Sequence, residues 1–234
     1  TAGSEEPNAI VQVNDNTDRT EPNVRATEVE IYDGLIASSQ NCWPSVNFDI
    51  GGINNAISAF LPAGFYYKTF MWPASFWEKY EYFIRHSAGL GKSPTEKDPD
   101  IYDHRNIHCD VLVVGAGISG ILAAKNAAKN NLKTLLVDEK NELGGATIYQ
   151  NRELNKIDNQ SSSDWIKKEI QELRNIKNLE IKTRTSVAAY HGYNYLLARE
   201  NLTDHLEKKD KQGKIRQRLL KIRAKKVILA TGAL

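Results

Sequence analysis

Residues 111–120 read Val-Leu-Val-Val-Gly-Ala-Gly-Ile-Ser-Gly, and an alanine-rich segment follows them. The four apolar residues predict a buried strand, and residues 118–130 predict a helix directly after it. A GxGxxG sequence between a strand and a helix is the setting in which such glycines bind a dinucleotide. Gly115 permits the tight turn, Gly117 lets a pyrophosphate approach the backbone, and Gly120 lets the helix pack on the strand. The first turn of such a helix offers free N–H groups to phosphate.

Three further features follow this turn in the order expected for the same type of site. Residues 133–138 predict a second strand that ends at Asp138, close to the spacing at which a carboxylate accepts hydrogen bonds from the adenine ribose. This acid favours NAD or FAD over NADP, although Lys140 would soften the exclusion of a 2′-phosphate. The pair Gly144-Gly145 lets the loop turn close to a dinucleotide, and residues 230–232 (Ala-Thr-Gly) resemble the second strand-turn of FAD/NAD-binding proteins. Four such elements in order are far more specific than any one of them.

The pattern of residues 107–234 predicts an α/β fold, namely a Rossmann-like FAD/NAD(P)-binding domain whose parallel sheet carries a small antiparallel insertion. An amphipathic helix is expected over residues 163–178. The remaining expected strands are residues 180–185, 187–190, 193–199, 202–208, 215–222 and 224–230, with a hairpin turn at 210–214 and the last strand buried. The basic residues between Lys208 and Arg218 are expected to form a solvated face.

Residues 1–106 differ in character from the rest. Residues 1–30 are polar and predict one short strand at 9–13, as in the tail of an incomplete domain. Residues 31–106 form an aromatic-rich connector, with eleven aromatic side chains between Phe60 and Phe83 and a helix expected over residues 75–85. So many neighbouring rings predict that residues 65–77 pack at a domain or subunit boundary rather than line a ligand pocket.

Composition excludes several classes of function. Lys and Arg number 31 against 29 Asp and Glu, so no basic field is available for a nucleic acid. The longest apolar runs are too short for a membrane-spanning helix, which needs about 20 residues. Cys42 and Cys109 form no CxxC pair and are expected to be small buried or half-buried thiols, and the five histidines lack metal-ligand spacing. We therefore expect no metal site, no catalytic residue in this chain and a cytoplasmic location.

Several segments resemble the alpha subunits of heterotetrameric sarcosine oxidases. The resemblance is carried by residues 21–27, 61–73, 76–79, 88–91, 109–115, 138–139, 142–145 and 222–225. The aromatic segment is specific, because no general dinucleotide-binding pattern requires it. The resemblance implies that this chain is a fragment, with the tail of a ferredoxin-like domain, a connector and the first part of an NAD-binding domain.

The resemblance also implies cofactors and partners. NAD would bind this subunit, whereas FAD and FMN would belong to the complete complex with the beta, gamma and delta subunits. Sarcosine would be oxidised to glycine on another subunit, its one-carbon unit would pass to tetrahydrofolate, and oxygen would be reduced to hydrogen peroxide. The fragment alone would be inactive.

The expected cofactor contacts can be assigned by position. By resemblance, the pyrophosphate would lie at the turn formed by Gly115, Gly117, Ser119 and Gly120. The adenosine ribose would lie at Asp138, Glu139 and Lys140, and Val187 would flank the adenine. Ala146 or Thr147, directly after the glycine pair, would make a further contact. The general pattern adds Gly145, Thr231 and Gly232, whose small size lets the chain pass beside the cofactor.

Three alternatives remain open at this stage. The chain could belong to a related amine or opine oxidase or dehydrogenase with the same layout. It could be a stand-alone FAD/NAD-dependent reductase, although the disulfide-using kind needs two nearby thiols, and none lies near residues 144–148. It could also be a scaffold in which the dinucleotide binds but never turns over.

Overall fold

The computed structural model describes residues 10–14, 20–26, 29–40, 42, 44–45, 47–50, 72–87, 89–91, 93–148 and 156–232. The chain divides into two compact units, each described here by itself. One consists of Asp100–Asp204 and Lys211–Leu234, and the other of Ala2–Pro99 and His205–Asp210. Every predicted cofactor contact belongs to the first of these units.

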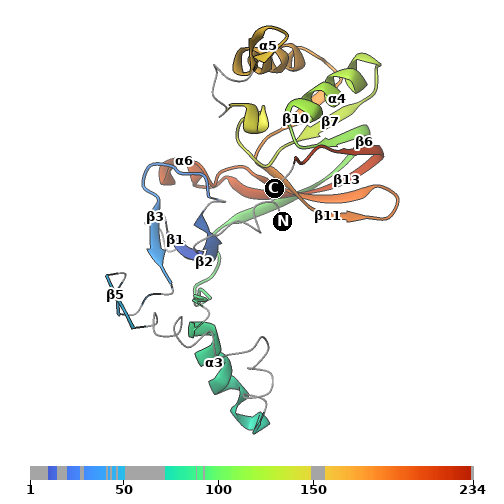
Figure 1. The fold of residues 1–234 in the computed structure, drawn as a ribbon. Helices are drawn as coiled ribbons and strands as arrows, with labels where there is room; N and C mark the ends of the chain where they lie inside the picture. The colour runs from blue at the N-terminus through green and yellow to red at the C-terminus, as the bar shows by residue number, and fades with distance from the viewer. Residues whose placement is uncertain are drawn as a thin grey trace. The chain divides into compact units, whose positions relative to one another are not determined.

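The first unit is built on a six-stranded sheet with the strand order β10-β7-β6-β13-β12-β11 (Figure 1). Its strands are β6 (Ile101–Val114), β7 (Thr134–Val137), β10 (Leu179–Lys182), β11 (Thr185–His191), β12 (Tyr195–Asn201) and β13 (Ile215–Leu229). The first four strands of that order pair in parallel, and β12 and β11 extend the sheet antiparallel. The predicted α/β fold with an antiparallel insertion is therefore confirmed.

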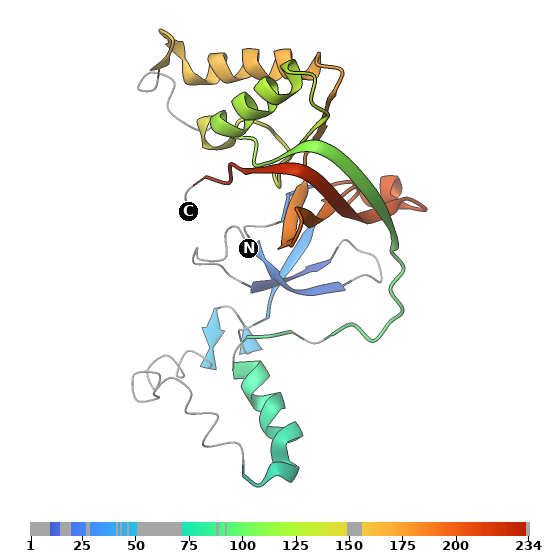
Figure 2. The ribbon, with the colours of Figure 1, turned by 90° about the vertical axis from the view of Figure 1, so that its right-hand side faces the viewer.

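Helices α4 (Ile118–Lys129) and α5 (Ser162–Arg174) share one core with this sheet (Figure 2). Successive side chains of a strand point to opposite faces. Val111 and Val113 accordingly pack with the two helices, whereas Leu112 and Val114 pack with residues of β12 and β13. The strand that leads into the glycine turn is thus buried on both faces, which fixes the position of the turn.

The course of β13 corrects two predictions. The chain pairs with β6 from Ile215 to Leu229, with a register shift between Ile215 and Gln217, so the expected strands 215–222 and 224–230 belong to one strand. The expected hairpin around residues 210–214 is also wrong, because α6 (Lys208–Lys211) lies there and the antiparallel partner of β13 is β12. No glycine or proline interrupts residues 215–229, so nothing in the backbone forces a break.

The expected burial of residues 224–230 holds for Ala224 and is wrong for the rest of the segment. Ile228 is 38% exposed and Leu229 60% exposed. The pairing with β12 ends where Arg223 faces Tyr195, so within the described residues the last part of β13 pairs with β6 alone. An apolar strand is buried only where other elements cover it. The sequence of β13 does not show that its pairing with β12 ends at Arg223.

Two arginines of β13 contradict the expected solvated basic face. The Arg216 side chain is 9% exposed and forms ion pairs with Asp100 and Asp204 at 2.8 and 2.7 Å. The Arg218 side chain is 11% exposed and forms ion pairs with Asp103 and Glu200. Both arginines therefore pair with acids that lie at least twelve residues away in the sequence.

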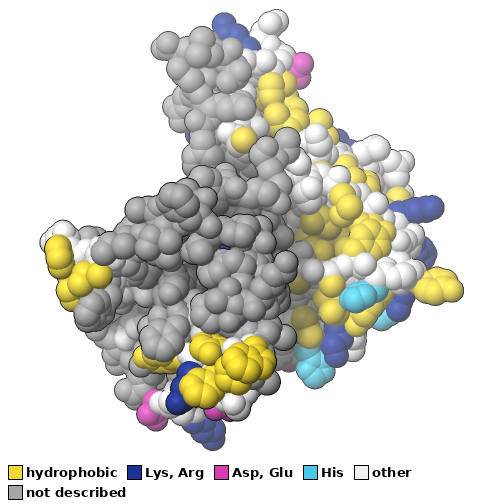
Figure 3. All heavy atoms as spheres, turned by 60° about the horizontal axis from the view of Figure 1, so that its bottom comes forward, with side chains coloured by type: hydrophobic (Ala, Val, Ile, Leu, Met, Phe, Trp, Pro, Cys, Tyr) yellow, Lys and Arg dark blue, Asp and Glu magenta, His cyan; other side chains and the backbone are white. Residues whose placement is uncertain are grey.

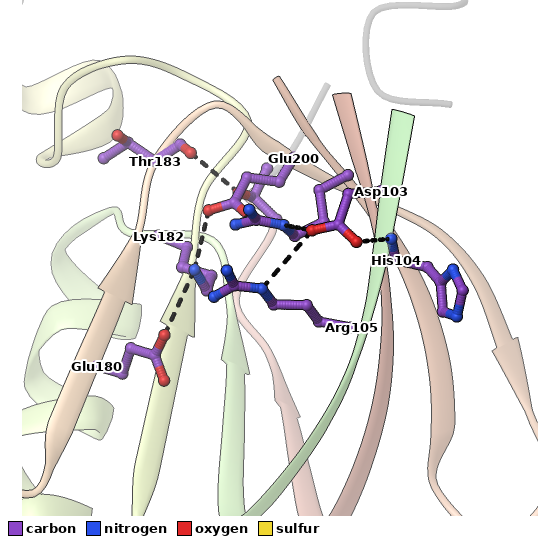
Figure 4. A network of polar contacts seen from close by, with 9 residues as sticks. Asp103, His104, Arg105, Glu180, Lys182, Thr183 and Glu200 are labelled. Atoms are coloured by element: carbon purple, nitrogen blue, oxygen red, sulfur yellow. Dashed lines mark hydrogen bonds and ion pairs between the residues drawn. The ribbon is translucent and has the colours of Figure 1, made fainter. Parts of the chain in front are cut away.

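Figure 4 shows how this network continues across the strands. Glu200 accepts a hydrogen bond from Lys182 at 2.9 Å, and Lys182 also pairs with Glu180 at 3.3 Å. The hydrogen bond from Arg218 is the main cause that lowers the pKa of Asp103 below its ordinary value. This chain of alternating acidic and basic side chains connects β10, β12, β13 and β6 on one side of the sheet.

The second unit contains a three-stranded antiparallel sheet with the order β2-β1-β3. Its strands are β1 (Ile10–Asn14), β2 (Thr20–Arg25) and β3 (Ile36–Ser39), and only β1 corresponds to a predicted strand. The sequences of β2 and β3, TEPNVR and IASS, lack the apolar alternation that signals a strand. The short pairs β4 (Pro44–Ser45) with β5 (Phe48–Asp49), and β8 (Lys156–Ile157) with β9 (Gln160–Ser161) in the first unit, complete the strands.

The predicted helix in the aromatic region is confirmed as α3 (Trp77–Ser87), preceded by the 3₁₀ turn η4 (Ala74–Phe76). Residues 51–71 lie outside the described part, and so does most of the segment expected to pack at a boundary. Trp72 is 82% exposed in this chain, and Phe76, Trp77 and Tyr82 are also exposed. Hydrophobic side chains are visible at the surface in Figure 3. The burial of these rings in a larger assembly stays a prediction.

Candidate functional site

Two of the three motif glycines are required by the fold itself. Gly115 has a φ of +96°, and a Cβ placed there would lie 2.4 Å from the carbonyl oxygen of Ala230. A Cβ on Gly120 would lie 1.8 Å from the carbonyl oxygen of Gly115. Both contacts are with backbone atoms that cannot move aside, so any side chain at either position would force strand and helix apart.

Gly117 is different, because nothing in the described part of the chain requires a glycine there. Its φ of −70° and ψ of −175° are open to any residue, and apart from its two chain neighbours no atom of the described residues lies within 4 Å of a Cβ built on it. The missing side chain leaves open space directly beside the helix N-terminus. A pyrophosphate that must approach the backbone is a physical reason for glycine at this position.

The N-terminus of α4 is left available to an anion. Gly117 is its N-cap and provides no side-chain hydrogen bond, and its first turn contains no acidic residue. Ser119 is exposed in that turn. The first N–H groups of a helix have no partner within the helix and carry partial positive charge, so this end of α4 suits a phosphate.

The loops predicted to contact a dinucleotide meet at this turn. The Ala116 N–H donates to Asp138 Oδ2 at 2.6 Å, and the Ala116 carbonyl accepts a hydrogen bond from Gly144 N–H at 2.8 Å. A Cβ on Gly145 would lie 3.0 Å from Gly117 Cα. The GxGxxG turn, the acidic loop, the glycine pair and the Ala-Thr-Gly turn are therefore neighbours in space.

The acidic loop has one half-buried and two exposed residues. Asp138 directly follows β7, and its Oδ1 accepts a hydrogen bond from the Lys140 N–H at 2.8 Å. Glu139 and Lys140 are exposed. All three predicted ribose contacts thus lie at the carboxyl end of a parallel strand, next to the phosphate turn.

The remaining predicted contacts occupy different environments. In the 3₁₀ turn η5 (Gly145–Ile148), Ala146 is exposed whereas Thr147 is only 5% exposed. Val187 in β11 is half-buried and packs against the core cluster that contains Val114 and Val137. Thr231 and Gly232 are exposed.

Two residues were absent from the predicted contacts although they organise the turn. Ala116 is fully buried, and Gly144 adopts a φ of +121° while donating to it. The first glycine of the Gly144-Gly145 pair is the signal that pointed toward this role, since a positive φ favours glycine. Nothing in the sequence marks Ala116, because its role is carried by backbone atoms.

The cysteines and the histidines provide no alternative centre in the described residues. Cys109 is buried, which raises the pKa of its thiol to about 11, and Cys42 is half-buried. Both therefore agree with the predicted buried or half-buried thiols. Among the described residues no cluster of His, Cys, Asp or Glu could hold a metal ion. None of the helices in that part of the chain is long and apolar enough to cross a membrane.

Comparison with known proteins agrees with this geometry. Residues 110–225 match the family described as FAD dependent oxidoreductase. The chain is 45% identical over all 234 residues to the sarcosine oxidase subunit alpha of Rhizobium meliloti (strain 1021), of which it covers 23%. It is 39% identical over 146 residues to the sarcosine oxidase subunit alpha of Corynebacterium sp. (strain U-96), a match that covers 62% of this chain and 15% of that protein.

Among solved structures, the chain is similar to the L-proline dehydrogenase of P. horikoshii. The TM-score is 0.44 at 23% sequence identity, over 61% of this chain and 26% of that one.

The chain spans about a quarter of the length of the Rhizobium meliloti relative and is similar to it from end to end. Its GxGxxG turn lies within the region that matches the oxidoreductase family. This chain is therefore a homologue of the sarcosine oxidase alpha subunits and corresponds to a part of such a subunit.

Proposed function

We propose that this chain is the dinucleotide-binding part of a sarcosine oxidase alpha subunit and that the dinucleotide is NAD. The observation that carries the proposal is the open space at Gly117 beside an uncapped helix N-terminus. The fold itself requires Gly115 and Gly120, whereas in the described part of the chain no packing contact requires glycine at position 117, and a bound pyrophosphate would account for it. The similarity to alpha subunits over the whole chain supports the choice of protein class.

The residues present suit an adenine dinucleotide. The pyrophosphate would receive hydrogen bonds from the first turn of α4, near Gly117 and Ser119. The ribose would lie at Asp138 and Glu139, whose charge disfavours a 2′-phosphate. NAD, when bound, carries hydride chemistry at its nicotinamide. The residues of this chain bind and orient the dinucleotide.

The proposal extends to the complete assembly. In that assembly the beta, gamma and delta subunits, with FAD and FMN, would oxidise sarcosine to glycine. The one-carbon unit would pass to tetrahydrofolate, and electrons would pass to oxygen to form hydrogen peroxide. The reaction would take place in the cytoplasm, and sarcosine would bind another subunit. An alpha-type subunit of a related amine or opine oxidase is the alternative that shares this layout.

A second candidate is FAD at the same turn. The description of the matching family, FAD dependent oxidoreductase, favours it. The acids at Asp138 and Glu139 do not decide between the two, because NAD and FAD share the adenosine ribose. The two candidates therefore differ only in the part of the cofactor beyond the pyrophosphate.

Cofactor release from the intact protein decides between them. We expect denaturation of the complete assembly to release NAD together with the flavins. The Gly117→Asp assembly should lose NAD and keep its flavins, because a carboxylate would occupy the phosphate position. Loss of FAD with NAD retained would establish the second candidate. A parent assembly without NAD would overturn the proposal.

A further inference from the structure

We propose that one exposed face of the first unit's sheet docks an acidic surface of another polypeptide in the complete assembly. This inference rests on the proposed function, because that function places the chain in an assembly of several subunits. The face belongs to β6, β13, β12 and β11 and lies opposite the side that packs in the core, and we call it the outer face. The residues of the outer face that carry the argument are His108, His191, Tyr195, Arg199, Lys221 and Arg223.

Strand alternation separates the outer face from the core. In β13, Leu220 and Ile222 are fully buried and belong to a core cluster. Successive side chains of a strand point to opposite sides, so Leu219, Lys221 and Arg223 lie on the outer face. Leu219 is 41% exposed, Lys221 is half-buried and Arg223 is exposed. In Figure 3 hydrophobic side chains lie beside those of His, Lys and Arg on the described surface. The outer face therefore combines apolar and cationic side chains.

Side chains from all four strands form rows across the outer face. His108 is opposite Arg223, which in turn is opposite Tyr195. Tyr195 is opposite His191 on the neighbouring strand. A second row consists of His104, Leu219 and Arg199. Because such cross-strand neighbours lie close together, they can contact a single partner at the same time.

The positive charge of the outer face is not neutralised within the described part of the chain. Residues 211–234 contain eight Lys and Arg and no Asp or Glu. On the core side of β13, Arg216 and Arg218 each form ion pairs with two acids. On the outer face, Lys221 and Arg199 form no ion pair with any residue that the structure describes. Two faces of the same strands thus differ in charge balance.

The tip of the β11–β12 hairpin adds an aromatic side chain that this chain does not use. Tyr193 has a φ of +58°, a conformation that is uncommon for a bulky residue. Its side chain is 94% exposed, so packing within the chain does not account for a tyrosine there. Glycine would adopt the same backbone at no steric cost. A contact with another molecule is a physical reason for tyrosine at this position.

Arg223 is held in place beside the hairpin tip. Its Nη1 donates to the carbonyl oxygen of Tyr193 at 2.9 Å, and its guanidinium carbon lies 4.8 Å from the centroid of the Tyr195 ring. A guanidinium fixed in this way loses little freedom when it binds a carboxylate. Arginine and tyrosine are also enriched among the residues that dominate protein–protein binding energy. The hairpin tip is therefore expected to be the anchor of the docking surface.

Charge complementarity selects the partner. A second copy of the same face would bring unneutralised cations together, which disfavours self-association through it. On β6 the acid that follows His108 is Asp110, and it is already paired with Lys225 at 2.8 Å. An acidic polypeptide surface would supply carboxylates to Lys221 and Arg199 and cover the exposed part of Leu219. We therefore assign the outer face to such a surface on another subunit.

Carbodiimide cross-linking of the complete assembly tests this contact directly. The reagent condenses a lysine amine with a carboxylate that touches it, with loss of water, and mass spectrometry identifies the joined peptides. We expect Lys221 to be joined to an Asp or Glu of another subunit. Lys167, an exposed lysine of α5, is the control and should form no such link. Links from Lys221 only to carboxylates of this same sequence would overturn the proposal.

Substitutions measure the contribution of the outer face to assembly. Dissociation of this chain from the other subunits is followed by ultracentrifugation for the parent, Lys221→Glu, Tyr193→Gly and the control Lys167→Glu. We expect Lys221→Glu to raise the dissociation constant roughly tenfold at low salt, and less at about 0.5 M salt because screening weakens the repulsion. Tyr193→Gly should weaken assembly by a similar factor and still fold, since glycine suits the positive φ.

The possible outcomes separate this inference from the proposed function. Unchanged dissociation for both Lys221→Glu and Tyr193→Gly would overturn the inference, and so would an equal effect of Lys167→Glu. An assembly that lacks NAD but joins Lys221 to another subunit would overturn the proposed cofactor and support the docking surface. A parent chain that associates with no other subunit would overturn the proposed assembly and this inference together.

Discussion

The N-termini of α4 and α5 lie in the same unit and are built in opposite ways. In α5 the N-cap Ser161 accepts a hydrogen bond from the Asp164 N–H at 3.2 Å, and Asp164 places a negative charge in the first turn. In α4 the N-cap is Gly117, with no side-chain cap and no acid in the first turn. The N-cap side chain of α5 satisfies one of the first N–H groups of that helix, whereas the N-cap of α4 has no side chain that could do so.

This difference shows where the unit gives up stability for binding. A serine or aspartate cap stabilises a helix by about 1 kcal/mol relative to alanine, and α5 has one. A serine or aspartate at position 117 could stabilise α4 in the same way, because the backbone there accepts any residue and space is available for a side chain. An uncapped end beside open space is therefore evidence of a ligand site that helix propensity alone does not reveal.

The largest expected effect comes from Gly120→Ala. Its Cβ would meet the Gly115 carbonyl oxygen at 1.8 Å, so we expect about 3 kcal/mol or more of destabilisation and little folded protein. Gly117→Ala is the matched control and should change the free energy of unfolding by at most about 1 kcal/mol. Denaturant unfolding measures both. Equal destabilisation by the two changes would show that Gly117 is also a packing glycine.

Gly117→Asp would make the α4 terminus resemble that of α5. We expect the free energy of unfolding to stay constant or to rise by up to about 1 kcal/mol, because the new carboxylate caps the helix. The affinity for dinucleotide should fall by roughly a hundredfold, or about 2.7 kcal/mol, since the carboxylate takes the phosphate position. Calorimetry with NAD measures the second effect. Undiminished binding would mean that the phosphate lies elsewhere.

Lys125 joins the two helices and gives a test of intermediate size. It lies on α4 and forms ion pairs with Glu169 and Glu172 on α5. Lys125→Met should destabilise the protein by about 1–3 kcal/mol, because it leaves the nearly buried Glu169 carboxylate without its cation. Dinucleotide affinity should hardly change, since neither residue reaches the turn. A large loss of affinity would show that the helix pair orients the site.

The ion pair between Lys125 and Glu172 predicts that the stability of the protein depends on pH. The hydrogen bond from Lys125 lowers the pKa of Glu172 below its ordinary value. A carboxyl group with a lowered folded-state pKa contributes stability above its unfolded pKa and loses it as the pH falls through the folded value. The difference in stability between the parent and Lys125→Met should therefore shrink below about pH 4. A difference that stays constant down to pH 2 would contradict the ion pair.

The smallest effect is expected at the capped helix. Ser161→Ala should cost about 1 kcal/mol of stability, because the Asp164 N–H loses its acceptor. Retention of dinucleotide should be unchanged, in contrast to Gly117→Asp. Thermal unfolding and cofactor release measure the two quantities. If Ser161→Ala releases the dinucleotide, the two helix ends are not independent.

Local sequence was sufficient for the dinucleotide turn and its first helix. The apolar run before Gly115, the alanine-rich segment of α4 and the acid directly after β7 are patterns that lie within a few neighbouring residues. Such local patterns can be recognised in the sequence without knowing the rest of the fold. The strands β2 and β3 were missed because their residues are polar and form a strand only by pairing with β1. The single long β13 was missed because its continuity depends on β6 beside it.

The sequence by itself determined which residue types lie at the turn: three glycines, an acid pair, the glycine pair Gly144-Gly145 and the Ala-Thr-Gly segment. Only the tertiary structure decided what each of them does. Gly115 and Gly120 are required by backbone contacts with Ala230 and with Gly115 itself, whereas Gly117 faces open space. Asp138 meets the N–H of a residue far away in the sequence. Spacing along the chain records which residues are near one another, but a hydrogen bond or a steric contact exists only once strands and loops have been brought together.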